Sequence, residues 1–221
     1  MLAKKLQAGL AELSLDLSAQ QQKQLLDYVA MIAKWNKVYN LTAIREEGEM
    51  LSHHLLDSLA VILPLQKHLI GLQANTGGAY RLLDVGAGAG LPGIVVAICC
   101  PEILVTCVDA VGKKAAFIQQ VALALALPNL RGIHARVEAM LPADIAYGFD
   151  VITSRAFATL AEFVRLTTGL LAPTAGVWMA MKAKANAESA DLPKDVTVFH
   201  VEQLRVPSLS EDRRLVWMRV H

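Results

Sequence analysis

The sequence predicts an α/β protein: a doubly wound, mostly parallel seven-stranded Rossmann-like sheet that ends in an antiparallel hairpin and carries an N-terminal helical cap. Three observations support this fold class. Apolar residues recur with helical spacing through the first 70 residues. From Arg81 onward, short apolar runs alternate with helix-length segments, as in parallel sheets. The last two extended runs, 196–206 and 215–220, have no helix-length segment between them and should therefore pair antiparallel.

Three helices are expected before the sheet, at 1–13, 18–38 and 47–63. Ser18 can begin the second helix, because its hydroxyl can accept a hydrogen bond from an unpaired N–H of the first turn. Pro64 should end the third helix, because a proline inside a helix lacks the backbone N–H donor and its ring clashes with the preceding turn.

Strands and helices then alternate along the chain. Strands are expected at 82–85, 102–109, 130–135, 149–154 and 176–181, and helices at 92–98, 111–127 and 160–171. The segment 71–79 is rich in glycine and polar residues and predicts a linker. We therefore expect two parts, an N-terminal helical cap at 1–70 and an α/β domain at 71–221.

A glycine-rich turn joins the first strand to its helix, with Gly86, Gly88 and Gly90 following Asp84. Glycines allow left-handed backbone angles and let a ligand approach the chain closely. Asp109 ends the second strand about 20 residues later, at the position where a carboxylate can bind ribose hydroxyls. Together these features predict a cofactor that contains adenosine.

Two cofactor classes fit this turn. The segment 88–93 matches the dinucleotide pattern G-x-G-x-x-G, so a nicotinamide-dependent oxidoreductase is one interpretation. The alternative is the methyltransferase form, in which Asp84 precedes Gly86, Gly88 and Gly90 and faces the cationic amino end of S-adenosylmethionine. We favour the second, because a carboxylate beside a pyrophosphate would add like-charge repulsion.

Charge, cysteine content and hydropathy limit the partners and the cellular compartment that we expect. The formal net charge is +1 over 221 residues, so any nucleic acid must be bound by a local basic patch. Cys99, Cys100 and Cys107 fit no zinc motif and indicate buried free thiols in a reducing compartment. No segment resembles a signal peptide or reaches the length of a membrane span. We therefore expect a cytoplasmic protein with no membrane partner.

One cluster invites a metal interpretation, because His53 and Asp57 share a helix face and His54 is adjacent. Two close ligands without a third are too few for a typical metal site, so a capping or packing role is favoured. No metal is expected.

Several segments resemble the bacterial RsmG family, also called glucose-inhibited division protein B. They are 35–36, 40–42, 54–58, 84–93, 136–138, 154–157 and 213–216. The family methylates guanine N7 in the 530 loop of 16S ribosomal RNA, with S-adenosylmethionine as the cofactor. The resemblance implies this activity here, with the small ribosomal subunit as partner and 71–221 as the methyltransferase domain; we expect a monomer. A ribosome-assembly factor that binds the cofactor without turnover is a further alternative.

The resemblance also implies roles for individual residues. By matching position, Gly86 and Leu91 would contact the cofactor, Val137 and Glu138 would hold its adenine, and Arg155 would close the site. Asp84, Gly88, Gly90 and Asp109 complete the expected cofactor-binding set.

The chemistry of guanine N7 limits what the protein must supply. N7 carries an in-plane lone pair and no proton, so in-line methyl transfer needs positioning and exclusion of water but no general base. We therefore expect no catalytic base and name Asn40 and Arg155 as substrate-positioning candidates. Each has a structural alternative: Asn40 could cap a helix C-terminus, and Arg155 could serve an ion pair.

Overall fold

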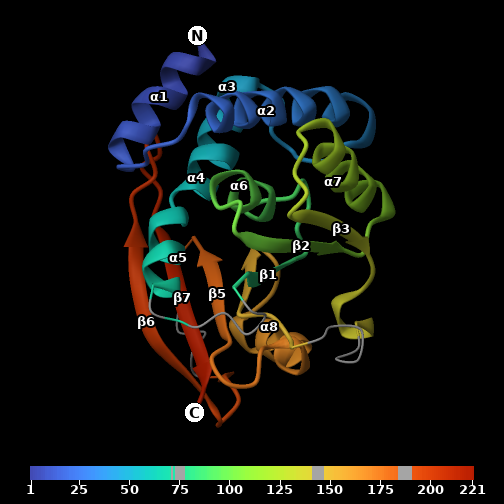
Figure 1. Ribbon diagram of the computed structural model, residues 1–221, viewed down its shortest axis with the longest axis vertical. Coiled ribbons are helices and arrows are strands. Elements are labelled where there is room, and N and C mark those ends of the chain that lie inside the picture. The colour runs from blue at the N-terminus through green and yellow to red at the C-terminus, as the bar shows by residue number, and fades with distance from the viewer. Residues whose placement is uncertain (71, 73–77, 141–146, 184–190) are drawn as a thin grey trace.

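The computed structural model describes residues 1–70, 72, 78–140, 147–183 and 191–221, so most of the expected linker at 71–79 lies outside the described residues (Figure 1). Its strands form one seven-stranded sheet in the order β3-β2-β1-β4-β5-β7-β6. They are β1 (Tyr80–Val85), β2 (Ile103–Asp109), β3 (Leu130–His134), β4 (Val151–Arg155), β5 (Val177–Lys182), β6 (Val196–Leu204) and β7 (Arg213–Val220). The first five strands pair in parallel, and β7 runs antiparallel to both β5 and β6, which confirms the predicted sheet and its terminal hairpin.

Helices cover both faces of this sheet. They are α1 (Leu2–Glu12), α2 (Ala19–Tyr39), α3 (Glu47–Met50), the π-helix η1 (Leu51–Leu56), α4 (Asp57–Leu59), α5 (Ile62–Leu69), α6 (Gly93–Cys99), α7 (Gly112–Ala124), the 3-10 turn η2 (Val137–Ala139), α8 (Leu160–Thr167) and the 3-10 turn η4 (Thr168–Leu170). Helices α2, α6 and α7 lie on one side of β1, β2 and β3, and α8 lies on the other side (Figure 1).

The alternation of side chains along the strands builds a core on each face. In β1, Leu82 packs in the cluster that contains α6 and α7, whereas Leu83 and Val85 pack in the cluster that contains α8. Successive side chains of a strand point to opposite faces, so a strand buried on both sides is apolar throughout. Because β1, β2 and β4 are parallel neighbours, their carboxyl ends meet at one edge of the sheet.

Helix boundaries confirm some predictions and correct others. Ser18 begins α2 as expected, with a capping box in which its Oγ accepts the Gln21 N–H at 3.2 Å. The expected single helix at 47–63 is wrong, because this region is divided into α3, η1, α4 and the start of α5. Pro64 does not end a helix but lies in the first turn of α5, where its missing N–H would have had no helical acceptor. Helix α7 ends at Ala124 rather than at 127, because Ala126 has a left-handed φ of 51°.

The sequence predicts neither a membrane-spanning helix nor a metal site. Within the described residues, no helix is long and apolar enough to cross a membrane. The same residues contain no cluster of three or more His, Cys, Asp or Glu side chains that could hold a metal ion.

Gly93→Ala should destabilise the protein, because the first residue of α6 has no space for a side chain. A Cβ at Gly93 would lie 2.9 Å from the Asp84 Oδ2 atom and would overlap the Cys107 Sγ atom. Overpacking of this kind costs roughly 1–3 kcal/mol of unfolding free energy, measurable by urea denaturation.

Gly48→Ala is the matched control. Gly48 lies in α3, and the nearest atom to its Cβ position is the Lys5 Nζ atom at 3.8 Å. Removing a helical glycine there should leave stability unchanged or raise it by up to about 1 kcal/mol. Equal effects of the two substitutions would contradict the close packing of Gly93.

Candidate active site

The glycine turn after β1 adopts a conformation that side chains would prevent. Gly86, Gly88 and Gly90 have φ angles of 63°, 61° and 88°. A Cβ at Gly90 would overlap Ile94, whereas a Cβ at Gly88 would meet no atom closer than 3.9 Å. Gly90 is therefore buried by packing, and Gly88 faces open space.

Asp109 holds this turn from the neighbouring strand. Its Oδ2 atom accepts the Gly88 N–H at 2.9 Å, and its Oδ1 atom accepts the Val111 N–H at 2.8 Å. Each carboxylate oxygen can accept a second hydrogen bond. Asp109 can therefore support the turn and still bind a ligand hydroxyl.

Asp84 supports the turn from the protein interior. It is fully buried, and its Oδ2 atom accepts the Gly93 N–H at 2.8 Å. Its Oδ1 atom has no hydrogen-bond partner among the described residues. Burial raises the pKa of Asp84 to about 7, against the opposing effects of the Gly93 N–H and the Arg155 charge. Asp84 lines neither of the two cavities at the turn, so the structure places it under the backbone and not at a cavity surface.

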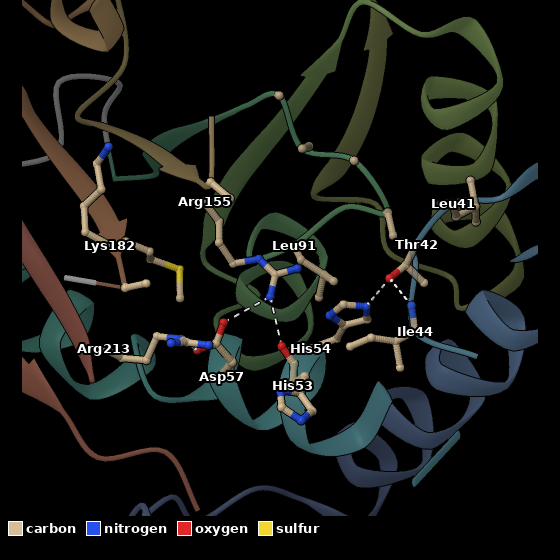
Figure 2. A pocket seen from close by; sticks show the side chains of 17 residues that line it. Leu41, Thr42, Ile44, His53, His54, Asp57, Leu91, Arg155, Lys182 and Arg213 are labelled. Atoms are coloured by element: carbon tan, nitrogen blue, oxygen red, sulfur yellow. Dashed lines mark hydrogen bonds and ion pairs between the residues drawn. The ribbon is translucent and has the colours of Figure 1, made fainter. Parts of the chain in front are cut away.

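Two cavities meet at the turn, and Gly86 lines both. The wide cavity, of about 460 Å³, lies between the turn, the α2–α3 loop, the η1–α4 segment and the ends of β4, β5 and β7 (Figure 2). The narrow cavity, of about 220 Å³, lies between the ends of β1 and β2, the η2 turn and α8. A Cβ at Gly86 would lie 2.5 Å from the Phe157 Cδ2 atom, so the junction between the cavities has no room for a side chain.

In the wide cavity, Asp57 joins two arginines that come from different strands, Arg155 at the end of β4 and Arg213 at the start of β7. Its Oδ2 atom lies 3.0 Å from Arg155 Nη1, and its Oδ1 atom lies 3.0 Å from Arg213 Nε (Figure 2). Arg155 Nη1 also donates to the His53 carbonyl at 3.1 Å. The Asp57 side chain is only 3% exposed, so the ion pairs are shielded from water and hold both guanidinium groups in place.

The two arginines differ in what they can still bind. All three nitrogens of Arg213 are used, by Asp57, by the Asp212 carbonyl and by the Glu211 carboxylate. Among the described residues, Arg155 has hydrogen-bond partners only at Nη1. Its Nε and Nη2 donors are therefore available to a ligand in the wide cavity.

A second polar network fixes the loop that forms the other wall. His54 Nε2 is 2.7 Å from the Thr42 Oγ1 atom (Figure 2). Asn36 accepts the Thr42 N–H at 2.9 Å and donates to the Ile44 carbonyl at 2.9 Å. Burial, aided by the Arg155 charge, lowers the pKa of His54 to about 4, so this imidazole is neutral at pH 7.

Most of the predicted site residues line one of the two cavities at the glycine turn. Gly86, Gly88, Leu91 and Arg155 line the wide cavity, and Asp109, Val137 and Glu138 join Gly86 around the narrow one. Asp84 and Gly90 are buried beneath the turn. Asn40 is exposed in the left-handed C-cap of α2 and lines neither cavity, although Leu41 beside it lines the wide one.

Sequence reasoning missed the residues that organise the wide cavity. Asp57 was considered for a metal, capping or packing role, and Arg213 was included only in the segment 213–216 that resembles a known family. Asp57 lies 98 residues from Arg155 and 156 residues from Arg213 along the chain. The signal that could have pointed to Asp57 and Arg213 was their presence in segments that resemble a known family.

Known proteins resemble this chain over nearly its full length. It matches the family model described as rRNA small subunit methyltransferase G over residues 21–216. It is 58% identical over 217 residues to the ribosomal RNA small subunit methyltransferase G of Polaromonas naphthalenivorans, covering 97% of this chain and 94% of that protein. The protein of the same name from Albidiferax ferrireducens is 59% identical over 219 residues, covering 97% of this chain and 95% of that protein.

Solved structures share the fold at low identity. A SAM dependent methyltransferase from Aquifex aeolicus superposes with a TM-score of 0.52 at 14% identity, covering 77% of this chain and 93% of that one. TrmN from Thermus thermophilus gives a TM-score of 0.54 at 18% identity, covering 77% of this chain and 53% of that one. These similarities confirm the predicted methyltransferase type of sheet.

Asp84→Asn should change how stability depends on pH. The pKa of Asp84 is about 7 in the folded protein and near 3.8 in an unfolded chain, so the folded state binds more protons between these values. The free energy of unfolding contributed by Asp84 should therefore fall as pH rises from about 4 to 7. Asparagine keeps an acceptor for the Gly93 N–H and removes this dependence.

The measurement is urea denaturation of both proteins at several pH values from 5 to 8. His54 has a lowered pKa and makes stability rise with pH over part of this range, but it is present in both proteins and cancels in the difference. The stability of the parent relative to Asp84→Asn should decrease as pH rises. Parallel profiles would show that Asp84 titrates normally.

Proposed function

Because the chain belongs to the rRNA small subunit methyltransferase G family, we propose that it methylates N7 of a guanine in the 530-loop region of 16S ribosomal RNA, with S-adenosylmethionine as methyl donor. The observation that carries this proposal is the braced glycine turn at the junction of two cavities. When bound, the cofactor supplies an electrophilic methyl group. The protein residues must bind the cofactor and the substrate and orient them for the transfer.

The narrow cavity suits the adenosine end of the cofactor. Asp109 can accept hydrogen bonds from ribose hydroxyls, and Val137 supplies an apolar contact for a planar base. Glu138 adds an acceptor for an exocyclic amino group. The open side of Gly88 leaves room for a ligand to cross into the wide cavity. We assign the cofactor-binding role to these residues together with Gly86 and Leu91.

The turn is poorly suited to a dinucleotide. The Gly93 N–H, which begins α6, is bonded to Asp84, and Pro92 has no N–H to offer. A pyrophosphate at this position would lose these donors and would lie near the Asp84 carboxyl group. The match of segment 88–93 to the dinucleotide pattern therefore has no support from the donors of the folded turn.

The wide cavity suits the target guanine. Arginine donors commonly bind the O6 and N7 atoms of guanine, but a donor on N7 would block its lone pair. We infer that Arg155 donates through Nε or Nη2 to O6 or to a neighbouring phosphate and leaves N7 free. Its orientation is fixed by Asp57 and by the His53 carbonyl.

The charged groups of this cavity agree with a reaction that needs no general base. Asp57 has both oxygens bonded to guanidinium groups. His54 is a weak base, because its pKa is lowered to about 4, and its Nε2 atom is engaged by Thr42. We propose that residues 1–70 act as a cap that closes one wall of the cavity through Leu41, Thr42 and Ile44. Asn40, just outside that wall, is a candidate contact for the RNA backbone.

Base mapping after reaction with labelled S-adenosylmethionine tests the proposed function. Small-subunit RNA or particles should carry one new 7-methylguanine in the 530-loop region. Gly88→Asp is the control: at a φ of 61° its side chain would fill the ligand space, so both S-adenosylhomocysteine binding and methylation should be lost.

Three outcomes would contradict parts of this account. Methylation of another base or atom would refute the substrate. Binding of S-adenosylhomocysteine without any methylated base would indicate a non-catalytic assembly factor. Thermal stabilisation by NADH alone would favour the oxidoreductase.

Arg155→Lys should separate substrate positioning from cofactor binding. Lysine keeps the charge but loses the planar fork that reaches Asp57 and the ligand together. We expect kcat to fall roughly ten- to hundredfold, the scale of one lost charge-assisted hydrogen bond, with little change in S-adenosylhomocysteine affinity. Arg165→Lys on α8, which lines neither cavity, should leave both values unchanged. A large loss of cofactor affinity at Arg155→Lys would instead assign Arg155 to the cofactor.

A further inference from the structure

A third cavity lies on the sheet face that also bears the narrow cavity, nearer the start of the strands. It has a volume of about 380 Å³ and is lined by Arg81, Leu104, Thr106, Arg131 and Tyr147 among others. Val85 and Val108 line the narrow cavity on the same face, because side chains two or four residues apart share a face of a strand. Gly86 lies five residues beyond Arg81, about 16–17 Å along an extended strand.

Two guanidinium groups converge in this groove. Arg131 is anchored through Nε to the Thr106 Oγ1 atom at 2.8 Å, and Arg81 lies over the Phe149 ring at 5.4 Å from its centroid. The strand registers place Arg81 opposite Leu104, and Thr106 opposite both Leu83 and Arg131. Burial, and second the charge of Arg131, lower the pKa of Arg81, as expected for two like charges in one groove.

Within the described part of the chain, Asp150 is the acid that acts on Arg81. Asp150 accepts the Arg81 backbone N–H at 2.8 Å and raises the pKa of Arg81. Among the described residues, two guanidinium groups therefore share the groove with this one carboxylate. A phosphate group would relieve the repulsion and accept hydrogen bonds from both arginines.

The groove also exposes one aromatic and one aliphatic side chain. Tyr147 is 67% exposed and Leu104 is 45% exposed at its wall. An exposed aromatic ring beside cations is the usual platform for an unstacked nucleotide base. The exposure of Tyr147 and Leu104 favours a segment of a polymer, because small free ligands are normally enclosed over most of their surface.

We propose that this groove, formed by Arg81, Arg131, Tyr147 and Leu104, binds a single-stranded nucleotide of the RNA substrate away from the target guanine. The proposal rests on the proposed function, since it takes the ribosomal RNA as the ligand. It also explains how a protein with a formal net charge of only +1 can hold RNA, because the phosphate contacts are local.

The test measures RNA binding without turnover. Fluorescence anisotropy follows a labelled 530-loop RNA with flanking helices, added to protein saturated with S-adenosylhomocysteine. The double variant Arg81→Gln/Arg131→Gln is compared with Lys4→Gln/Lys67→Gln, which removes the same charge from exposed sites on α1 and α5. We expect the RNA Kd of the first variant to rise about tenfold. Its plot of log affinity against log salt should become shallower by about 1.4–1.8, the value for two lost phosphate contacts.

Tyr147→Ala provides a second variant, at a side chain that is largely exposed. Loss of one stacked base should raise the RNA Kd at least about fivefold. S-Adenosylhomocysteine affinity should be unchanged in every variant. An RNA Kd and salt slope equal to those of the lysine control would overturn the proposal, and so would an unchanged Kd for Tyr147→Ala.

This result can be separated from the proposed function. Because binding is measured without methyl transfer, RNA that depends on Arg81 and Arg131 for binding but gains no methylated guanine would refute the activity and support the groove. Methylation at guanine N7 with groove variants equal to the control would do the reverse.

Discussion

Two buried carboxylates hold the glycine turn in the arrangement in which Gly86 lines both cavities. Asp84 bonds to the Gly93 N–H below the turn, and Asp109 bonds to the Gly88 N–H from the next strand. The turn cannot supply this rigidity itself, because three glycines with left-handed φ angles have the greatest conformational freedom in the unfolded chain. The acids therefore serve the site first by fixing backbone, and the ligand contacts follow from that fixed shape.

The wide cavity depends on a comparable constraint among side chains. Asp57 belongs to the helical segment before the sheet, whereas Arg155 ends β4 and Arg213 begins β7. Their shared ion pairs connect the N-terminal helices to both the parallel and the antiparallel part of the sheet. Removing one partner would leave an uncompensated charge in a cavity wall, which is costly because the Asp57 side chain is almost completely shielded from water.

Local patterns in the sequence were sufficient for the fold and for the turn. Strand alternation, the Ser18 cap and the missing crossover before the last strand each depend on neighbouring residues, and the structure confirms them. The helix at 47–63 was predicted wrongly, because a π-helical turn and a proline in the first turn of α5 give no clear local signal. Asp57, Arg213 and the Asn36–Thr42–His54 network were missed for a different reason: their partners are set by tertiary packing. The position of Asp84 is intermediate, since its place after the strand was predictable but its complete burial was not.

A crystal structure with S-adenosylhomocysteine tests the central claim most directly, because that claim assigns one end of the cofactor to each cavity. We predict the adenine against Val137 and Glu138, the ribose hydroxyls at Asp109, and the sulfur on the wide-cavity side of Gly86, facing Arg155. An adenine ring in the wide cavity, or a ligand that avoids the glycine turn, would contradict this account of the site.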